Sequence, residues 1–184
     1  MRLIFLLLLT LAPTVCSAET EGFGELCPSQ ICLWRRPIID APTGWERDEK
    51  FSRKNQNNSF FPTNPSFGES LMYASSFYRP NPNTQTLKEF IEEDRGKFIE
   101  SANGTYSKVV EKPDLKTGDD KPLKVLSFET TYNNRQQFDL VAYGEEGDMF
   151  LIITLSSPSL ETYNSSLPSF KAFVGGYYEK PKNR

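Results

Sequence analysis

The C-terminal half of the chain alternates apolar and polar residues in short runs that end at turn residues. This period of two is typical of strands and predicts strands over 105–111, 122–132 and 136–144, and a short apolar run predicts a further strand over 149–156. The connections between them are short, with Asn133 and Asn134 in one and Gly147 in another. Because Asn and Gly tolerate the positive φ of tight turns, we expect consecutive strands to be antiparallel neighbours.

The last of these strands is apolar on both faces from Met149 to Leu155. A strand with one wet face would alternate, so both faces of the sheet must be covered here. One covering helix is expected after Thr86, which forms a capping box with Glu89 and precedes an apolar face made of Leu87, Phe90, Ile91, Phe98 and Ile99. A second is expected from about Pro168. The predicted fold class is α+β, an antiparallel sheet meander sandwiched by helices.

The N-terminal half has weaker patterns. An aromatic strand is expected over 70–78, stopped by Arg79 and the two prolines that follow, and a short polar strand begins at Trp45. Asn, Gln and Pro between residues 55 and 65 indicate an irregular, mobile connection. Residues 19–37 have no sustained periodicity, and we expect them to lie against the domain.

The first 18 residues have the pattern of a secretory signal peptide. Arg2 is followed by an apolar run over 3–12, too short to span a bilayer, and by small residues that end at Ala18. The alternative, lipoprotein processing at Cys16, needs a small residue before the cysteine, where Val15 stands. We therefore expect an exported protein, periplasmic or secreted, with no later membrane span.

Composition excludes several kinds of function. The chain of 184 residues contains no histidine, the commonest proton shuttle and metal ligand, and we expect no metal and no cofactor. Its net charge of −3 does not provide the concentrated basic surface that nucleic acid requires.

Two cysteines of the exported chain are close together. Four residues separate Cys27 from Cys32, and in an oxidising compartment such neighbours usually form a disulfide. A redox pair is the alternative, but its usual spacing is Cys-x-x-Cys. The expected organisation is a signal peptide at 1–18, a segment with a local disulfide at 19–37, one domain at 38–180 and a tail at 181–184.

No catalytic motif is recognised. The chain contains no Ser-x-x-Lys, no complete nucleophile elbow and no phosphate-binding loop, and its adjacent carboxylates are typical of solvated surface. The candidate interaction surface consists of residue types common at interfaces, namely Trp34, Arg35, Arg36, Tyr78 and Arg79. The alternatives are an N-terminal arm packed on the sheet for the first three and core packing for the aromatic residues.

The order of these elements resembles a known family. Gly44-Trp45, the aromatic strand, the helix that starts Thr86-Leu-Lys-Glu-Phe, the meander, Leu155-Ser-Ser-Pro158 and Pro168-Ser-Phe-Lys-Ala-Phe173 occur in sequence. The chain resembles the PsbP/Mog1-like α/β/α family, including its bacterial envelope members, over about residues 38–180. The resemblance implies a compact domain that binds or stabilises other proteins, with no shared catalytic site.

Three functions follow as hypotheses. The first is an exported non-catalytic protein that binds or helps to assemble an envelope partner. The second is a small carboxylate-dependent hydrolase acting on sugars, which needs two carboxyls about 5 to 10 Å apart in a pocket. The third is a carrier of a small apolar ligand, which needs an apolar pocket between sheet and helix.

Overall fold

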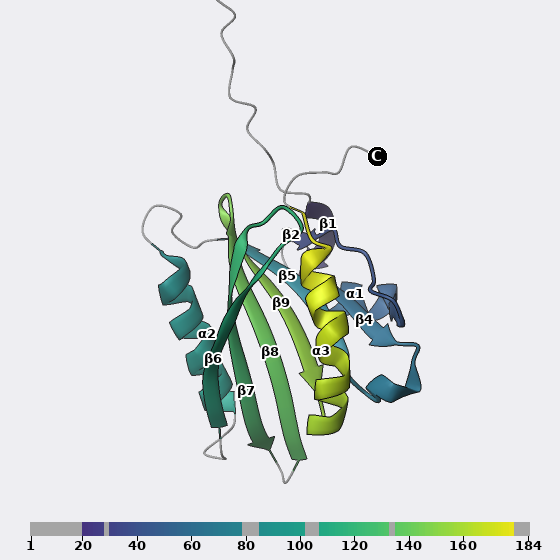
Figure 1. The fold of residues 1–184 in the computed structure, drawn as a ribbon. Helices are drawn as coiled ribbons and strands as arrows, with labels where there is room; N and C mark the ends of the chain where they lie inside the picture. The colour runs from purple at the N-terminus through teal and green to yellow at the C-terminus, as the bar shows by residue number, and fades with distance from the viewer. Residues whose placement is uncertain (1–19, 28–29, 79–84, 102–106, 133–134, 179–184) are drawn as a thin grey trace, which may run out of the picture.

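The computed structural model describes residues 20–27, 30–78, 85–101, 107–132 and 135–178. Their centre is a seven-stranded antiparallel sheet in the order β3-β4-β5-β9-β8-β7-β6 (Figure 1). The strands are β3 (Trp45–Arg47), β4 (Asn58–Pro62), β5 (Leu71–Tyr78), β6 (Ser107–Lys116), β7 (Pro122–Tyr132), β8 (Arg135–Glu146) and β9 (Met149–Ser157). The predicted meander of the last four strands is confirmed, and β5 joins it by pairing with β9.

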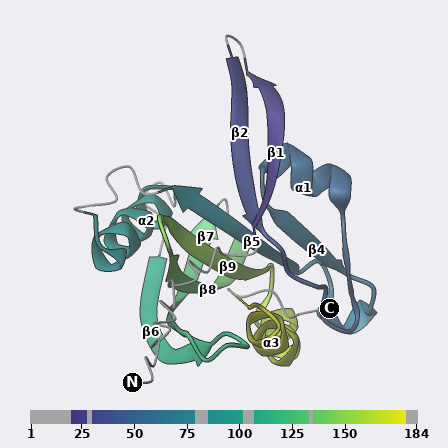
Figure 2. The same ribbon diagram turned by 90° about the horizontal axis from the view of Figure 1, so that it is seen from above.

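A helix covers each face of this sheet. Helix α2 (Leu87–Ser101) lies on one face, where Phe90 stacks on Phe150 and Phe98 on Phe128 with ring centroids 4.3 and 4.2 Å apart. Helix α3 (Leu160–Gly175) lies on the other and buries Phe170, Phe173 and Val174 (Figures 1 and 2). The predicted α+β class, with a sheet between helical layers, is therefore confirmed.

The start of α2 is the predicted capping box. The Thr86 backbone N–H donates to Glu89 Oε2 at 2.8 Å, and the Glu89 N–H donates to Thr86 Oγ1 at 3.3 Å. Of the predicted apolar face, Leu87, Phe90, Ile91 and Phe98 pack on the sheet, whereas Ile99 is 47% exposed. Ile99 follows Phe98 by a single residue, about 100° around the helix, and so turns away from the sheet.

The prediction for the start of the last helix was wrong. Helix α3 begins at Leu160, capped by Ser159, whose side chain accepts from the Thr162 N–H at 3.2 Å. Pro168 lies inside the helix and cannot donate to the Asn164 carbonyl. Both residues are exposed, so this carbonyl lies on the solvent side, where water can satisfy it.

The prediction of an irregular connection at 55–65 was also wrong. This region contributes the end of helix α1 (Glu49–Asn55), strand β4 and a 3₁₀ turn at Pro65–Phe67. Asn58 and Ser59 are buried in β4 although they are polar. The Asn58 side-chain N–H donates to the Pro37 carbonyl and the Ser59 N–H donates to Ser52 Oγ, so these donors are satisfied inside.

The segment before the domain differs from the expectation as well. It forms an antiparallel hairpin of β1 (Thr20–Cys27) and β2 (Gln30–Pro37). Figure 2 shows the hairpin extending away from the sheet beside α1, with the end of β2 near β5. It therefore touches the domain at its base and does not lie along it.

The predicted signal peptide, Cys16, Arg79 and the tail at 181–184 lie outside the described residues. Within the described ranges, none of the helices combines the length and the apolar character needed to cross a membrane.

Candidate functional site

The α2 face of the sheet carries a groove lined mainly by polar side chains, which we call the polar groove. Its cavity volume is about 640 Å³, and its lining is Glu69, Leu71, Arg135, Gln136, Gln137, Ser156 and Pro158. The register places Leu71 beside Ser156 and Ser156 beside Asp139, so three adjacent strands build its floor. In the last turn of α2, Phe98 packs on β7, which lies on the far side of β8 from β9. The helix therefore leaves this end of β5, β9 and β8 open, and the groove lies there.

A buried carboxyl lies beneath the polar groove. Asp139 is only 6% exposed, and Ser156 Oγ donates a hydrogen bond to its Oδ1. Ser156 Oγ in turn accepts from Gln137 Nε2 at 2.6 Å. Burial raises the pKa of Asp139 to about 6, although the hydrogen bond from Ser156 opposes this. A relay of three side chains therefore joins a titratable group to the groove, an arrangement that is enriched at functional sites.

Further polar groups lie on the same face of the sheet. Tyr143 on β8 donates to Asp94 Oδ2 on α2 at 2.8 Å, which joins helix to sheet. Burial raises the pKa of Asp94 and raises that of Tyr73 on β5 to about 12. The hydrogen bond between Tyr143 and Asp94 helps to hold α2 on the sheet.

A second groove, the apolar groove, lies between α2 and strands β6 and β7. Its volume is about 440 Å³, and charged residues line it except at four apolar positions, Leu87, Ile91, Val125 and Leu126. Asp114 on this rim accepts from Lys124 Nζ at 2.8 Å, and Glu92 pairs with Arg95 at 3.7 Å. These exposed ion pairs are typical of solvated surface.

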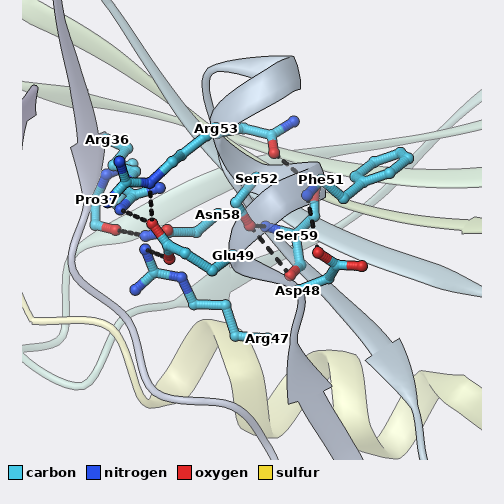
Figure 3. A network of polar contacts seen from close by, with 11 residues as sticks. Arg36, Pro37, Arg47, Asp48, Glu49, Phe51, Ser52, Arg53, Asn58 and Ser59 are labelled. Atoms are coloured by element: carbon cyan, nitrogen blue, oxygen red, sulfur yellow. Dashed lines mark hydrogen bonds and ion pairs between the residues drawn. The ribbon is translucent and has the colours of Figure 1, made fainter. Parts of the chain in front are cut away.

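One carboxylate takes a central part in attaching the hairpin to the domain. Figure 3 shows Glu49, in the first turn of α1, with Arg36 from β2, Arg47 from β3 and Arg53 from α1 around it. Arg36 reaches Glu49 Oε1 at 3.2 Å, Arg53 the same oxygen at 2.8 Å, and Arg47 reaches Oε2 at 2.6 Å. Arg53, followed by Arg36, lowers the pKa of Glu49. Glu49 therefore ties three elements together.

The described members of the predicted interaction surface lie on β2 and at the end of β5. Arg36 is 2% exposed and serves to anchor the hairpin. Trp34 stands opposite Phe23 and Arg35 opposite Gly22 in the hairpin register, while Tyr78 ends β5 beside Met149. Whether Trp34, Arg35 and Tyr78 contact a partner stays a prediction.

The cysteine pair also stays a prediction. Cys27 stands opposite Gln30 and Cys32 opposite Glu25, which places the two cysteines diagonally across the hairpin. Among the described residues, Cys, Asp and Glu side chains do not gather in threes as metal ligands would.

Sequence reasoning missed Asp139, Ser156 and Gln137 as a group. One signal was available, because Asp139 shares a strand face with Val141 and Tyr143 in an otherwise apolar run. A carboxylate in such a position is buried and needs a partner. The partner, Ser156, lies on the neighbouring strand, and only the β8–β9 register reveals it.

Solved structures resemble this fold at low sequence identity. PA94 from Pseudomonas aeruginosa, a protein of unknown function and candidate regulator, is 11% identical with a TM-score of 0.50, over 88% of this chain and 99% of that one. LpqN, involved in cell envelope biogenesis of Mycobacterium tuberculosis, is 10% identical with a TM-score of 0.43, over 75% of this chain and 79% of that one. PsbP (CyanoP) from Synechocystis sp. PCC 6803 is 13% identical with a TM-score of 0.43, over 93% of this chain and 98% of that one.

No protein-family model and no curated protein matches the chain. A PsbP protein is thus among the structures that this chain is similar to, in agreement with the resemblance noted from its sequence. At these identities the likeness concerns the fold alone.

Proposed function

We propose that this protein is exported and binds a partner protein of the cell envelope, without catalysis, through hairpin β1–β2. The observation that carries the proposal is the hairpin itself. Within the described residues, neither of its strands pairs with a third strand, and it extends away from the sheet (Figure 2). Free strand edges are ready to pair with another chain.

The anchoring of the hairpin supports the same role. A two-stranded hairpin alone is marginally stable in water. Here its base is fixed by the buried Arg36 on Glu49 and by the Asn58 amide on the Pro37 carbonyl (Figure 3). A Cys27–Cys32 disulfide would strengthen its far end. An element fixed in this way loses less conformational entropy when a partner binds.

Photo-crosslinking tests this proposal. A photoreactive amino acid replaces Trp34 in the full chain, expressed with its N-terminal segment in the native host, and the control carries it at Lys171, which is exposed on α3. We expect one discrete adduct from position 34 in the envelope fraction that position 171 does not give. Equal adduct patterns from the two positions, or none from position 34, would contradict the proposal.

Export is tested in the same material. Intact-mass measurement of the purified protein should show a chain that begins after Ala18, and alkylation without reductant should leave Cys27 and Cys32 unmodified. A chain that retains Met1 would contradict export. Alkylation of both cysteines would contradict the disulfide.

The apolar groove favours a second candidate function, that of a carrier for a small apolar ligand. It lies between a helix and the sheet, and its volume of about 440 Å³ falls in the range of ligand sites. Binding of the neutral dye N-phenyl-1-naphthylamine should fall in Ile91→Gln, which alters the groove wall, and not in Ile99→Gln, on the exposed side of the same helix. Equal dye binding by both variants would remove this candidate.

A further inference from the structure

We propose that the polar groove binds a neutral saccharide. Its cavity of about 640 Å³ is within the range of small-ligand sites, and its lining offers two amides, a hydroxyl, a guanidinium and a carboxylate. Each sugar hydroxyl both donates and accepts hydrogen bonds. A surface that presents donors and acceptors side by side is complementary to such a ligand.

The groups of the groove floor are held in fixed positions. The Ser156 hydroxyl directs its proton to the buried Asp139 and accepts from Gln137 Nε2 at 2.6 Å. Gln137 also hydrogen-bonds Asp139, so its carbonyl oxygen is the group that it retains for a ligand, with the amide plane set by the relay. Held in this way, the amide binds a ligand with little further loss of side-chain freedom.

The charges favour a neutral ligand. Arg135 and Glu69 are the two charged residues of the lining, both are exposed, and neither has an ion-pair partner among the described residues. The opposite charges of these two side chains cancel, and the buried carboxyl of Asp139 beneath the floor disfavours an anionic ligand. Both side chains remain available to hydrogen-bond hydroxyls.

The lining argues against an apolar ligand and against a peptide. Leu71 and Pro158 are the apolar residues of the lining, too few to bury an acyl chain or the side chains of an extended peptide.

An NMR titration tests the proposal with three neutral probes, maltotriose, cellotriose and chitotriose. Each is added to the ¹⁵N-labelled exported protein up to about 10 mM, because a shallow polar site is expected to bind on the order of 1 mM. We expect at least one probe to give saturable shifts at the amides of Arg135, Gln137 and Ser156. Absence of saturable shifts with all three, or shifts confined to the apolar groove, would overturn the proposal.

Matched variants localise the binding. Gln137→Ala should weaken binding about tenfold, as expected when one hydrogen-bonding group is removed, while Ser165→Ala, at an exposed position on α3, should leave it unchanged. Gln137 is only half-buried, so the variant is expected to fold, and its amide spectrum checks this. Unchanged binding by Gln137→Ala, or tighter binding of trialanine than of any sugar, would also overturn the proposal.

Discussion

Replacement of Asp139 by asparagine should stabilise the protein at neutral pH. The carboxyl is 6% exposed, and burial raises its pKa from 3.8 to about 6. The native state therefore binds the proton of the Asp139 carboxyl more tightly than the unfolded chain does. The stability that the protonated Asp139 carboxyl contributes is fully present below about pH 4, is lost as the pH rises towards 6, and stays lost above that value.

The size of the effect follows from the pKa difference. A rise from 3.8 to about 6 corresponds to about 3 kcal/mol at pH 7, because each unit corresponds to about 1.4 kcal/mol. The amide oxygen that the substitution introduces would still accept from Ser156, so the variant keeps the hydrogen bond without the buried charge. We expect Asp139→Asn to be up to about 3 kcal/mol more stable than wild type at pH 7 and equally stable near pH 4.

Urea unfolding at intervals between pH 4 and 8 measures this difference. The fluorescence of Trp45, which is buried and stacked on Phe67, reports unfolding. Asp94 and Glu146 also have raised pKa values through burial, so only the difference between variant and wild type isolates Asp139. Asp148→Asn, at an exposed turn, is the control and should change stability by less than about 0.5 kcal/mol. A variant less stable than wild type at pH 7, or a difference independent of pH, would refute the reasoning.

Three further predictions concern helix capping, hairpin anchoring and a buried pair. Thr86→Ala removes one side of the capping box and should cost about 1 kcal/mol in urea unfolding; no loss would mean that the cap is not formed in solution. Glu49→Gln weakens three ion pairs, each worth under about 1 kcal/mol because Glu49 is half exposed. This variant should speed trypsin cleavage within the hairpin, whereas the control Glu46→Gln should not. Tyr177→Phe deprives buried Glu146 of the donor that lies 2.5 Å from its Oε1 and should lower the stability at pH 7 by about 1 to 3 kcal/mol, and an unchanged urea midpoint would contradict this.

Sequence patterns predicted most of the fold wherever burial followed a simple period. Strands β5, β7 and β8 have clear alternation, β9 is a short run that is apolar on both faces, and α2 has a capping box, so the type of each was predictable. The pairing of β5 with β9 was not predicted. Strand β4 was not, because Asn58 and Ser59 are buried through hydrogen bonds to residues outside the strand. Polar residues satisfied by distant partners look like a loop in the sequence.

The candidate sites were less predictable than the fold. Asp139 and Ser156 are 17 residues apart, and only the register of β8 on β9 brings them together. Arg36 had the residue type of an interface, but its burial depends on Glu49 of α1, a helix that the sequence pattern did not predict. Sites assembled from several elements require the topology before their members can be recognised.

The pairing of β5 with β9 has a consequence for when the protein can fold. The two strands meet residue by residue from Leu71 on Ser156 to Tyr78 on Met149, across most of the domain's length. Contacts so far apart in the chain slow folding, since a long loop must close before they form. Until synthesis has reached residue 157, the first half of the sheet has no neighbour to complete it. A nascent chain therefore cannot close into its final shape before its last strand has been made.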